Sequence, residues 1–498
     1  MVVRRIAVSL SLLGMLAAVV GLGVSREPPR MVADTEPDGK TEGPAAAASN
    51  APVDDANAPD AAVETSATAV VDPEAAPIEP GEPIGLTVVG ASWEVLAPGV
   101  LANGGRAPAK DSQFSAAGLD VHFSPAKDAA DLETQLGLGG EAKGGADIAL
   151  MPLPTFVASY ERLRALSPQV FFVVAWSRGR DALTGDVNLV RKPPSKGHVK
   201  LGARAGSAEA LLGLFALSWA GVEPDRVDVI DPLAPMPKRA VKSLRRTKSR
   251  QVDARKVFLS TADATHLIPI VAIAPRGVLV DKRAAVAAFS RVWLQGTEGL
   301  AADPAAAARL LAAEAGAPKA VDLIDALGWL EFADLAESAA AVGLSGRRAS
   351  TLDTLFARTW RLWRRSGLIA TPPPRHVPLS AMVIAELAGE SKVGVRRDPT
   401  PAIAPPDASA KPVLVHRVRG DSLSTQAEVA LVNEAGFLAD VFARSPIRIT
   451  VPRSRTAAAR IASSAAQRFG LDADRFVVVT RRRGSRGAAA IVEVLPAV

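Results

Sequence analysis

Hydroxyl, aromatic and guanidinium side chains gather where short apolar runs of this sequence end. The residues are Ser92, Trp93, Met151, Trp176, Ser177, Gly206 and Ser207, and Arg178 and Arg180 follow closely on Ser177. Free backbone amides at the start of a helix after Gly206 would favour an anion, and an arginine offers a fork of donors to a carboxylate, sulfonate or phosphate. Residues of these types, brought together, would recognise a small anion.

Several of these residues also have an ordinary structural explanation. Trp176 could simply pack between two lobes, and Ser207 could be no more than a helix cap. Arg180 and Asp181 could form an ion pair at the surface, where such a pair contributes little to stability. The residues alone leave the binding and the structural explanations open.

The candidate residues depend on alternating strands and helices for their positions. Four apolar runs, GLDVHF, ADIALM, QVFFVVAW and VKLGARAG, end in polar or glycine turns, and segments of helical length follow them. This alternation predicts an α/β fold with a mostly parallel sheet and helices on both faces. Ligands of such folds bind beyond the carboxyl ends of the strands, which is where most of the candidate residues fall.

Groups that usually carry catalysis or hold a metal do not form a pattern here. The chain has no cysteine, which excludes disulfides and thiolate sites. No nucleophile elbow, phosphate-binding lysine loop or paired metal ligands occur. The five histidines are far apart: His122, His198, His266, His376 and His416. We therefore predict a protein that is not an enzyme and that has no metal or cofactor.

The first residues have the features of an export signal. Arg4 and Arg5 precede an apolar run at residues 6–24. Residues 1–26 are either a cleaved signal peptide or an anchor in which that run tethers the chain to the inner membrane, and both alternatives stay open. Residues 27–84 are rich in Ala, Pro and acidic side chains, which predicts a disordered linker. We therefore expect the rest of the chain in the periplasm.

The order of the motifs carries a family resemblance. GLDVHF, ADIALM, VVAWSRGRDAL, GARAGSAEALLGLFAL, FLSTADATHLI and GWLEFADLAESAAAVGL, in this order, resemble the periplasmic solute-binding proteins of nitrate, sulfonate and thiamine-precursor ABC transporters. The resemblance covers residues 85–392 and implies a two-lobed, type II periplasmic-binding-protein-like body with ligand in the cleft between the lobes. Lobe one would comprise about 85–185 and 275–392, and lobe two about 186–274, with crossings near Asp186 and Ala274. An ABC permease would be a partner.

One wall of the implied cleft departs from the family. Asp181, and Thr261 and Asp263 within FLSTADATHLI, join the candidate ligand-binding residues. Relatives usually have a DAAVVW-type segment before the strand that corresponds to VFLST, and its tryptophan helps to floor the cleft. This chain has the basic run PMPKRAVKSLRRTKSRQVDARK instead. We predict a solvated, mobile face there, with a dock for anionic lipid headgroups or wall polymer as the alternative.

A small α/β segment at residues 411–498 follows a second proline-rich linker at 393–410. With GLDADRFVVV as its best local match, it resembles the OmpA-like peptidoglycan-associated domain. That family binds diaminopimelate through an aspartate in a GHTD-type loop and an arginine in the next helix. This chain lacks the loop, and the arginine position falls near Ala457, with Arg455 or Arg460 as shifted substitutes. We predict a degenerate OmpA-like domain with weak or no peptidoglycan binding.

Two hypotheses for function follow. The leading one is a periplasmic solute-binding protein that captures a small anionic ligand in an interlobe cleft, for an ABC transporter. The alternative is a cell-envelope scaffold with degenerate binding domains and weak contact to peptidoglycan or anionic membrane. The chain outside the acidic linker is basic, but the export signal argues against nucleic acid as a partner.

Overall fold

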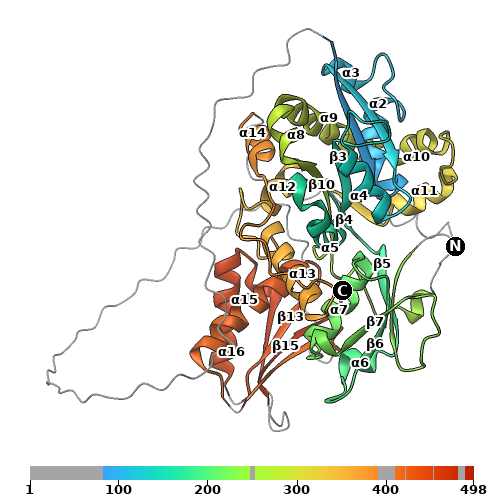
Figure 1. The fold of residues 1–498 in the computed structure, drawn as a ribbon. Helices are drawn as coiled ribbons and strands as arrows, with labels where there is room; N and C mark the ends of the chain where they lie inside the picture. The colour runs from blue at the N-terminus through green and yellow to red at the C-terminus, as the bar shows by residue number, and fades with distance from the viewer. Residues whose placement is uncertain are drawn as a thin grey trace, which may run out of the picture. The chain divides into compact units, whose positions relative to one another are not determined.

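The computed structural model describes residues 82–246, 253–390, 410–420, 422–452, 454–480 and 488–497, which form three β-sheets (Figure 1). The predicted signal or anchor at 1–26 lies outside these residues, as do most of the linkers predicted at 27–84 and 393–410. Among the described helices, none is both long and apolar enough to cross a membrane.

A six-stranded sheet in the order β11-β4-β10-β3-β1-β2 forms lobe one. Its strands are β1 (Ile84–Gly90), β2 (Leu119–Pro125), β3 (Ile148–Pro152), β4 (Pro168–Ser177), β10 (Pro269–Pro275) and β11 (Leu330–Phe332). The helices of its first half are η1 (Trp93–Leu96), α2 (Ala97–Asn103), α3 (Gln113–Ala116), α4 (Ala129–Leu138), α5 (Leu153–Leu163) and η2 (Arg164–Leu166). Those after β10 are α8 (Arg276–Asp281), α9 (Arg283–Ala302), α10 (Pro304–Ala312), α11 (Ala320–Leu327), α12 (Leu335–Ala341), α13 (Leu352–Arg365) and α14 (Met382–Glu390).

Both faces of this sheet are buried, as the alternation of strands and helices predicted. Along β1, Val89 belongs to one hydrophobic cluster and Val88 to a second cluster. Ala149 and Leu150 of β3 divide in the same way. Because successive side chains of a strand point to opposite faces, the two clusters lie on opposite sides of the sheet.

A five-stranded sheet in the order β7-β6-β8-β5-β9 forms lobe two. Its strands are β5 (Asp181–Gly185), β6 (Val199–Gly202), β7 (Val227–Ile230), β8 (Val241–Arg245) and β9 (Leu259–Ser260). Its helices are α6 (Asn188–Arg191), α7 (Ala208–Trp219), η3 (Pro224–Arg226) and η5 (Ala254–Lys256). Helix α13 packs against both α5 of lobe one and α7 of lobe two. The body is therefore a two-lobed α/β fold, as predicted.

The strand directions differ from the predicted, mostly parallel sheet. β1 is parallel to β2 and β3, but β10 is antiparallel to β3 and β4, and β11 is antiparallel to β4. In lobe two, β6 is parallel to β7 and β8, but β5 is antiparallel to both β8 and β9, so both sheets of the body are mixed. The prediction of a mostly parallel sheet was wrong because β4 leaves lobe one and β10 returns to it from lobe two, so these neighbours run in opposite directions.

The chain crosses between the lobes at residues 178–180 and again at 261–268. Both crossings come earlier in the sequence than the predicted positions near Asp186 and Ala274. β5 already belongs to the sheet of lobe two, and β10 already belongs to the sheet of lobe one. The apolar runs continue through the strands on both sides of each crossing, so hydrophobicity alone does not mark where the sheet changes.

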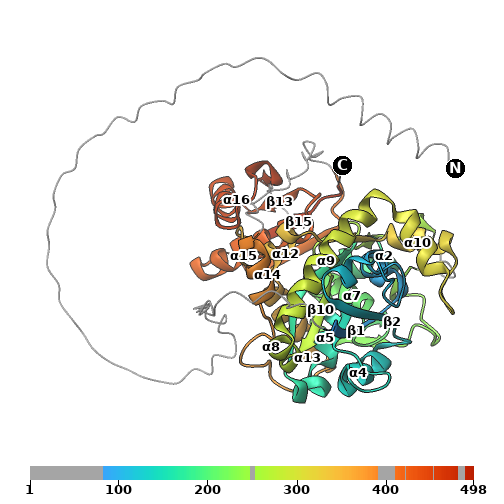
Figure 2. The ribbon, with the colours of Figure 1, turned by 90° about the horizontal axis from the view of Figure 1, so that it is seen from above.

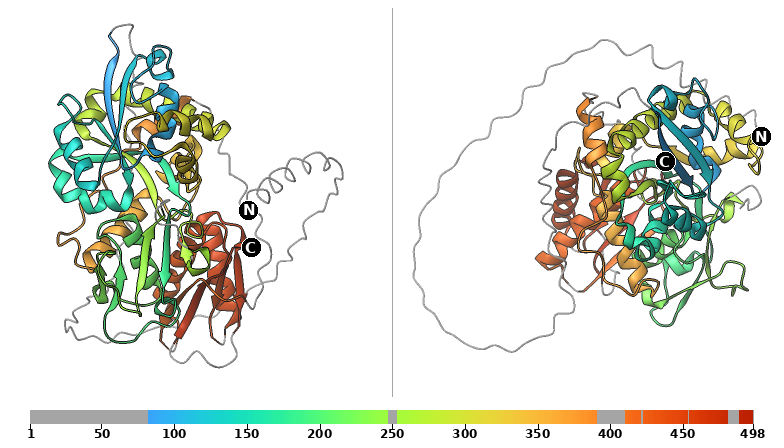
Figure 3. Two further views of the ribbon diagram at one scale, coloured as in Figure 1. Left: turned by 90° about the vertical axis from the view of Figure 1, so that its right-hand side faces the viewer. Right: turned by 45° about the horizontal axis from the view of Figure 1, so that its top comes forward.

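The C-terminal segment, called the tail below, has a four-stranded sheet in the order β12-β15-β13-β14. Its elements are β12 (Leu414–Arg419), α15 (Thr425–Val441), β13 (Ile447–Thr450), α16 (Arg455–Phe469), η6 (Ala473–Arg475), β14 (Phe476–Val479) and β15 (Ala488–Val494). Figure 3 shows this sheet beside lobe two, and Phe215 of α7 lies 6.4 Å from Phe437 and 6.3 Å from Phe442 of the tail, between ring centroids. The tail and lobe two thus share part of one hydrophobic core.

Helices α2 and α9 of lobe one lie side by side (Figure 2), and Gly296 permits their close approach. A Cβ atom at Gly296 would lie 2.3 Å from the carbonyl oxygen of Pro98, which is backbone and cannot rotate away. We expect Gly296→Ala to lower the free energy of unfolding by about 1–3 kcal/mol, although alanine is the better helix former.

The matched control is Gly299→Ala on the same helix, where the nearest atom to an added Cβ is Leu101 Cδ2 at 3.4 Å. This variant should be neutral or gain up to about 1 kcal/mol from helix propensity. Chemical denaturation of both variants tests the difference, and equal stability of the two would contradict the close approach.

Candidate functional site

The two crossing segments are joined by a buried group of hydroxyls. Ser177 ends β4, and its Oγ donates to Asp181 Oδ2 at 2.8 Å and lies 2.9 Å from Thr261 Oγ1. The turn between Ser177 and Asp181 needs the left-handed backbone of Gly179 (φ 93°), whose N–H donates to Thr261 Oγ1 at 2.8 Å. The first crossing is thereby fixed to the beginning of the second.

Asp181 is an unusual carboxyl group at this position. It is only 1% exposed, and its Oδ1 has no hydrogen-bond partner among the described residues. Burial, with Glu209 adding to it, raises the pKa of Asp181 to about 7, although Arg180 and the Ser177 hydroxyl act in the opposite direction. Near neutral pH this side chain therefore exists in both the protonated and the ionised form.

Arg180 connects this group to lobe one. Its Nη2 donates to Ser92 Oγ at 2.9 Å and to Glu94 Oε1 at 2.6 Å, and the residue is only 4% exposed. Arg245, at the end of β8 in lobe two, donates from its own Nη2 to the same Glu94 oxygen at 3.1 Å. One carboxylate thus holds two guanidinium groups across the junction of the lobes. Arg180 and Asp181 are both buried, so the alternative of a surface ion pair between them is wrong.

The structure brings Ser92, Ser177, Arg180, Asp181 and Thr261 together at this junction. The other predicted residues lie elsewhere. The Arg106 guanidinium lies over the Trp93 ring, 5.6 Å from the ring centroid, and Met151 is buried in β3. Asp263 accepts from Ser260 N and Oγ at 2.8 and 3.1 Å. The ligand-binding role of all of these residues stays a prediction.

Gly206 and Ser207 form the start of α7. Ser207 Oγ accepts from Ala210 N at 3.2 Å and donates to Arg204 O at 2.6 Å, so Ser207 caps the helix, which was the structural alternative. Gly206 has a left-handed backbone (φ 75°), and a Cβ atom there would lie 2.9 Å from the Cβ of Ala158. The turn before α7 therefore accounts for both residues.

Sequence reasoning missed Glu94 and Arg245. Arg245 lies in the basic run for which a solvated, mobile face was predicted, but residues 241–245 of that run are strand β8. The signal was the alternation in VKSLR, where Val241 and Ser243 are buried and Lys242 is exposed. Lys248 and Arg250 of the same run lie outside the described residues.

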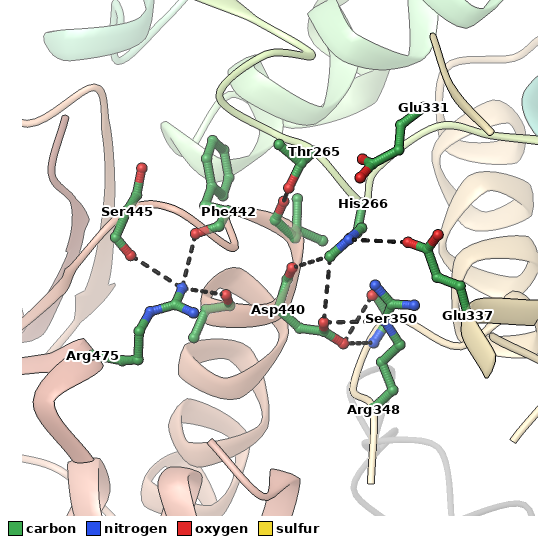
Figure 4. Close-up of polar contacts among 12 residues, drawn as sticks. Thr265, His266, Glu331, Glu337, Arg348, Ser350, Asp440, Phe442, Ser445 and Arg475 are labelled. Atoms are coloured by element: carbon green, nitrogen blue, oxygen red, sulfur yellow. Dashed lines mark hydrogen bonds and ion pairs between the residues drawn. The ribbon is translucent and has the colours of Figure 1, made fainter. Parts of the chain in front are cut away.

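A second polar group, around Asp440, joins the tail to the body (Figure 4). The Asp440 carboxylate, at the end of α15, accepts from Ser350 N and Oγ at 2.7 and 2.8 Å and from Arg348 Nε at 3.3 Å. Burial alone would raise the pKa of Asp440, but Arg348, His266 and the Ser350 amide together hold it well below its usual range. This carboxylate is therefore ionised throughout the physiological pH range.

His266 brings the second crossing segment into the same group. Its backbone N–H donates to Val441 O at 3.1 Å, and its ring Nδ1 lies 2.9 Å from the backbone oxygen of Asp440. Burial and the nearby Arg348 lower the pKa of His266 against the opposing effect of Asp440. The rings of His266 and Trp176 are 5.2 Å apart, and Arg348 lies 5.2 Å from the Trp176 ring. Trp176, a predicted ligand residue, thus packs where the crossing segment meets the tail.

A cavity of about 370 Å³ opens beside β2, an edge strand of lobe one. Its lining residues include Arg106, His122, Ser124 and Gln135. None of the predicted ligand residues lines it. Within the described ranges, no group of three or more His, Cys, Asp or Glu side chains is placed to hold a metal ion.

Comparison with known proteins finds likeness only among solved structures. No protein-family model matches the chain, and no curated protein matches it. The periplasmic nitrate-binding protein NrtA from Synechocystis PCC 6803 is 12% identical, with 63% of this chain and 90% of that chain covered and a TM-score of 0.43. The periplasmic aliphatic sulphonate binding protein SsuA from Escherichia coli is 13% identical, with 58% and 89% covered and a TM-score of 0.39.

The desulfurization enzyme DSZB is 12% identical, with 62% of this chain and 99% of that chain covered and a TM-score of 0.37. Binding proteins and an enzyme thus score alike, all at low identity.

Proposed function

We propose that this chain is a solute-binding protein that holds a small anion at the junction of its two lobes, with Arg180 as the main anchor. The observation that carries the proposal is the sharing of Glu94 by two guanidinium groups. Arg180 and Arg245 both contact Glu94 Oε1, at 2.6 and 3.1 Å. While the neighbouring Asp181 is protonated, the two positive charges of Arg180 and Arg245 against the one negative charge of Glu94 leave a surplus that attracts an anion, and the low exposure of Arg180 strengthens that attraction.

The anion would bind by taking the place that Glu94 occupies. A carboxylate, sulfonate or phosphate has the oxygen geometry to accept from both guanidinium groups, while the Ser92 hydroxyl keeps Arg180 in position. Glu94 and Ser92 follow β1 in lobe one, and Arg245 lies at the end of β8 in lobe two. The bound anion would therefore connect the lobes, and its affinity would reflect competition with Glu94.

The proposal also includes the cellular location of the protein, its transport partner and the role of the tail. We place the chain in the periplasm, exported by residues 1–26 as a cleaved signal or as an anchor to the inner membrane, and we assign it no catalytic activity. The captured solute would pass to an ABC permease. The tail is proposed as an OmpA-like domain that makes weak or no contact with peptidoglycan.

The test is thermal unfolding of the purified chain with a panel of small carboxylates, sulfonates and phosphates. A ligand that binds only the folded state stabilises it by about 2.7 kcal/mol at a concentration of 100 times its Kd. We expect at least one anion to raise the melting temperature of the wild-type chain, and Arg180→Met to abolish that shift. The shift should remain in Arg162→Met, because Arg162 forms an ion pair of the same length, 2.6 Å, with Glu133 but lies at the surface of lobe one, with its side chain 62% exposed.

One observation favours a second candidate function, a cell-envelope scaffold. The tail is fixed to the body by buried ionic contacts around Asp440, and Glu94 already partners the guanidinium groups of the lobe junction. A scaffold would need both features and no ligand. If no anion of the panel shifts the melting temperature, or if Arg180→Met responds like the wild type, the anion-binding proposal fails and the scaffold stands.

A further inference from the structure

The tail contacts lobe one, lobe two and the second crossing segment at the same time. Most of these contacts come from α15 and the residues that directly follow it. A segment that packs on one lobe alone leaves the other lobe free to move. A segment that is bound to both lobes, and to a connection between them, restricts how they can move relative to each other.

The contacts of the tail with lobe one are ionic and largely buried. The Asp440 carboxylate accepts from Ser350 N and Oγ at 2.7 and 2.8 Å and from Arg348 Nε at 3.3 Å, and both partners lie between α12 and α13. Earlier in α15, Glu434 accepts from the two terminal nitrogens of Arg358 in α13, at 3.0 and 3.1 Å. Two carboxylates of one tail helix are therefore bound to lobe one.

The contacts of the tail with lobe two are aromatic. Phe215 and Trp219 belong to α7, the helix that packs on strands β5, β6 and β8 of lobe two. The Phe442 ring centroid lies 6.3 Å from that of Phe215, and the His416 ring of β12 lies 4.9 Å from that of Trp219. Phe215, Trp219 and Phe442 are at most 7% exposed. The tail cannot leave lobe two without exposing these rings to water, which is unfavourable.

The second crossing segment is bound to the end of the same tail helix (Figure 4). The backbone N–H of His266 donates to Val441 O at 3.1 Å, and its ring Nδ1 lies 2.9 Å from the backbone oxygen of Asp440. The last carbonyls of a helix have no partner within the helix, so the crossing segment caps α15. Hinge motion between lobes changes the backbone angles of a few connecting residues. A crossing that is bound to a third element resists such changes.

We propose that the tail is an intramolecular brace that holds the two lobes at one angle. To rotate, lobe two must break either the ionic contacts between α15 and lobe one or the aromatic contacts between the tail and α7. Parts of a chain that share a small interface move relative to each other by default, so the lobes should open and close once the tail is released. The brace does not depend on whether an anion binds at the lobe junction.

The test measures the distance between the lobes by double electron–electron resonance of two spin labels on the full chain. The chain has no cysteine, so Ala130→Cys in lobe one and Lys200→Cys in lobe two create the only labelling sites, both at exposed positions. We expect one narrow distance distribution in the otherwise wild-type chain. Asp440→Ala removes the acceptor shared by Ser350 and Arg348, and it should add a second distance.

Glu428→Ala is the matched control, because Glu428 also lies in α15 but pairs with Arg460 of the tail itself. This variant should keep the single distance. If Asp440→Ala does not fold, Glu434→Gln replaces it as the milder variant, since the side chains of Glu434 and Arg358 are 30% and 26% exposed. It should show the second distance at a lower population.

Three results would overturn the brace. The first is two distances already present in the otherwise wild-type chain. The second is a single narrow distance in folded Asp440→Ala or, where it does not fold, in Glu434→Gln, because the lobes would then be held by their own contacts at Glu94. The third is the same second distance in Glu428→Ala, which would separate lobe opening from the contacts between tail and body.

Discussion

Asp440→Ala is expected to lower the free energy of unfolding by about 3–5 kcal/mol and to loosen the tail from the body. The variant leaves the Arg348 guanidinium, whose side chain is 12% exposed, without its carboxylate, and it leaves the buried Ser350 N–H and hydroxyl without an acceptor. Buried groups that lose a charged partner incur most of their desolvation cost. Urea denaturation of the full chain measures the loss, and hydrogen exchange of the α15 amides shows whether the tail separates first.

The control for this variant is Glu428→Ala, also in α15. Glu428 forms an ion pair of 2.5 Å with Arg460, but the arginine side chain is 58% exposed, so the loss should stay within about 1 kcal/mol. Similar losses in the two variants would show that the Asp440 contacts do not join the tail to the body. Retained protection of α15 in Asp440→Ala would show the same.

The strands of the body were predictable, but their partners were not. The runs that became β2, β3, β4 and β6 are short, apolar and bounded by turns, which is a local signal. The direction of β10 depends on the route of the chain through lobe two, and no local pattern records that route. β8 was missed because its charged residues concealed the alternation of Val241 and Ser243 with the exposed Lys242.

The candidate site divides in the same manner. Arg180, Asp181 and Ser177 are close in sequence, where β4 ends and β5 begins. The sequence was therefore sufficient to propose them together. Their partner Glu94 is 86 residues from Arg180 and 151 residues from Arg245, and such a contact depends on how the two lobes meet. The packing of the tail was equally hidden, because Ser350 and Asp440 lie 90 residues apart on either side of a proline-rich segment that predicted only separation.

Asp181 should make the free energy of unfolding of the chain depend on pH, because burial raises its pKa. Its pKa is about 7 in the folded chain and near 3.8 when it is unperturbed. Between these values the unfolded chain has lost a proton that the folded chain keeps. The protonated Asp181 side chain therefore contributes to the free energy of unfolding. This contribution is fully present below about pH 4, and it is lost as the pH rises through 7. The difference of about 3 between the pKa values corresponds to a loss of about 4 kcal/mol.

Asp181→Asn should therefore be close to the wild type in stability at pH 4 and more stable by up to about 4 kcal/mol at pH 8, because the amide stays neutral and keeps an acceptor for Ser177. Denaturation of both chains at the two pH values isolates this group, since every other titratable residue is shared. A difference that does not grow with pH would contradict the raised pKa. The same ionisation places a negative charge beside Arg180, so an anion bound there should weaken as the pH rises through 7 in the wild type but not in Asp181→Asn.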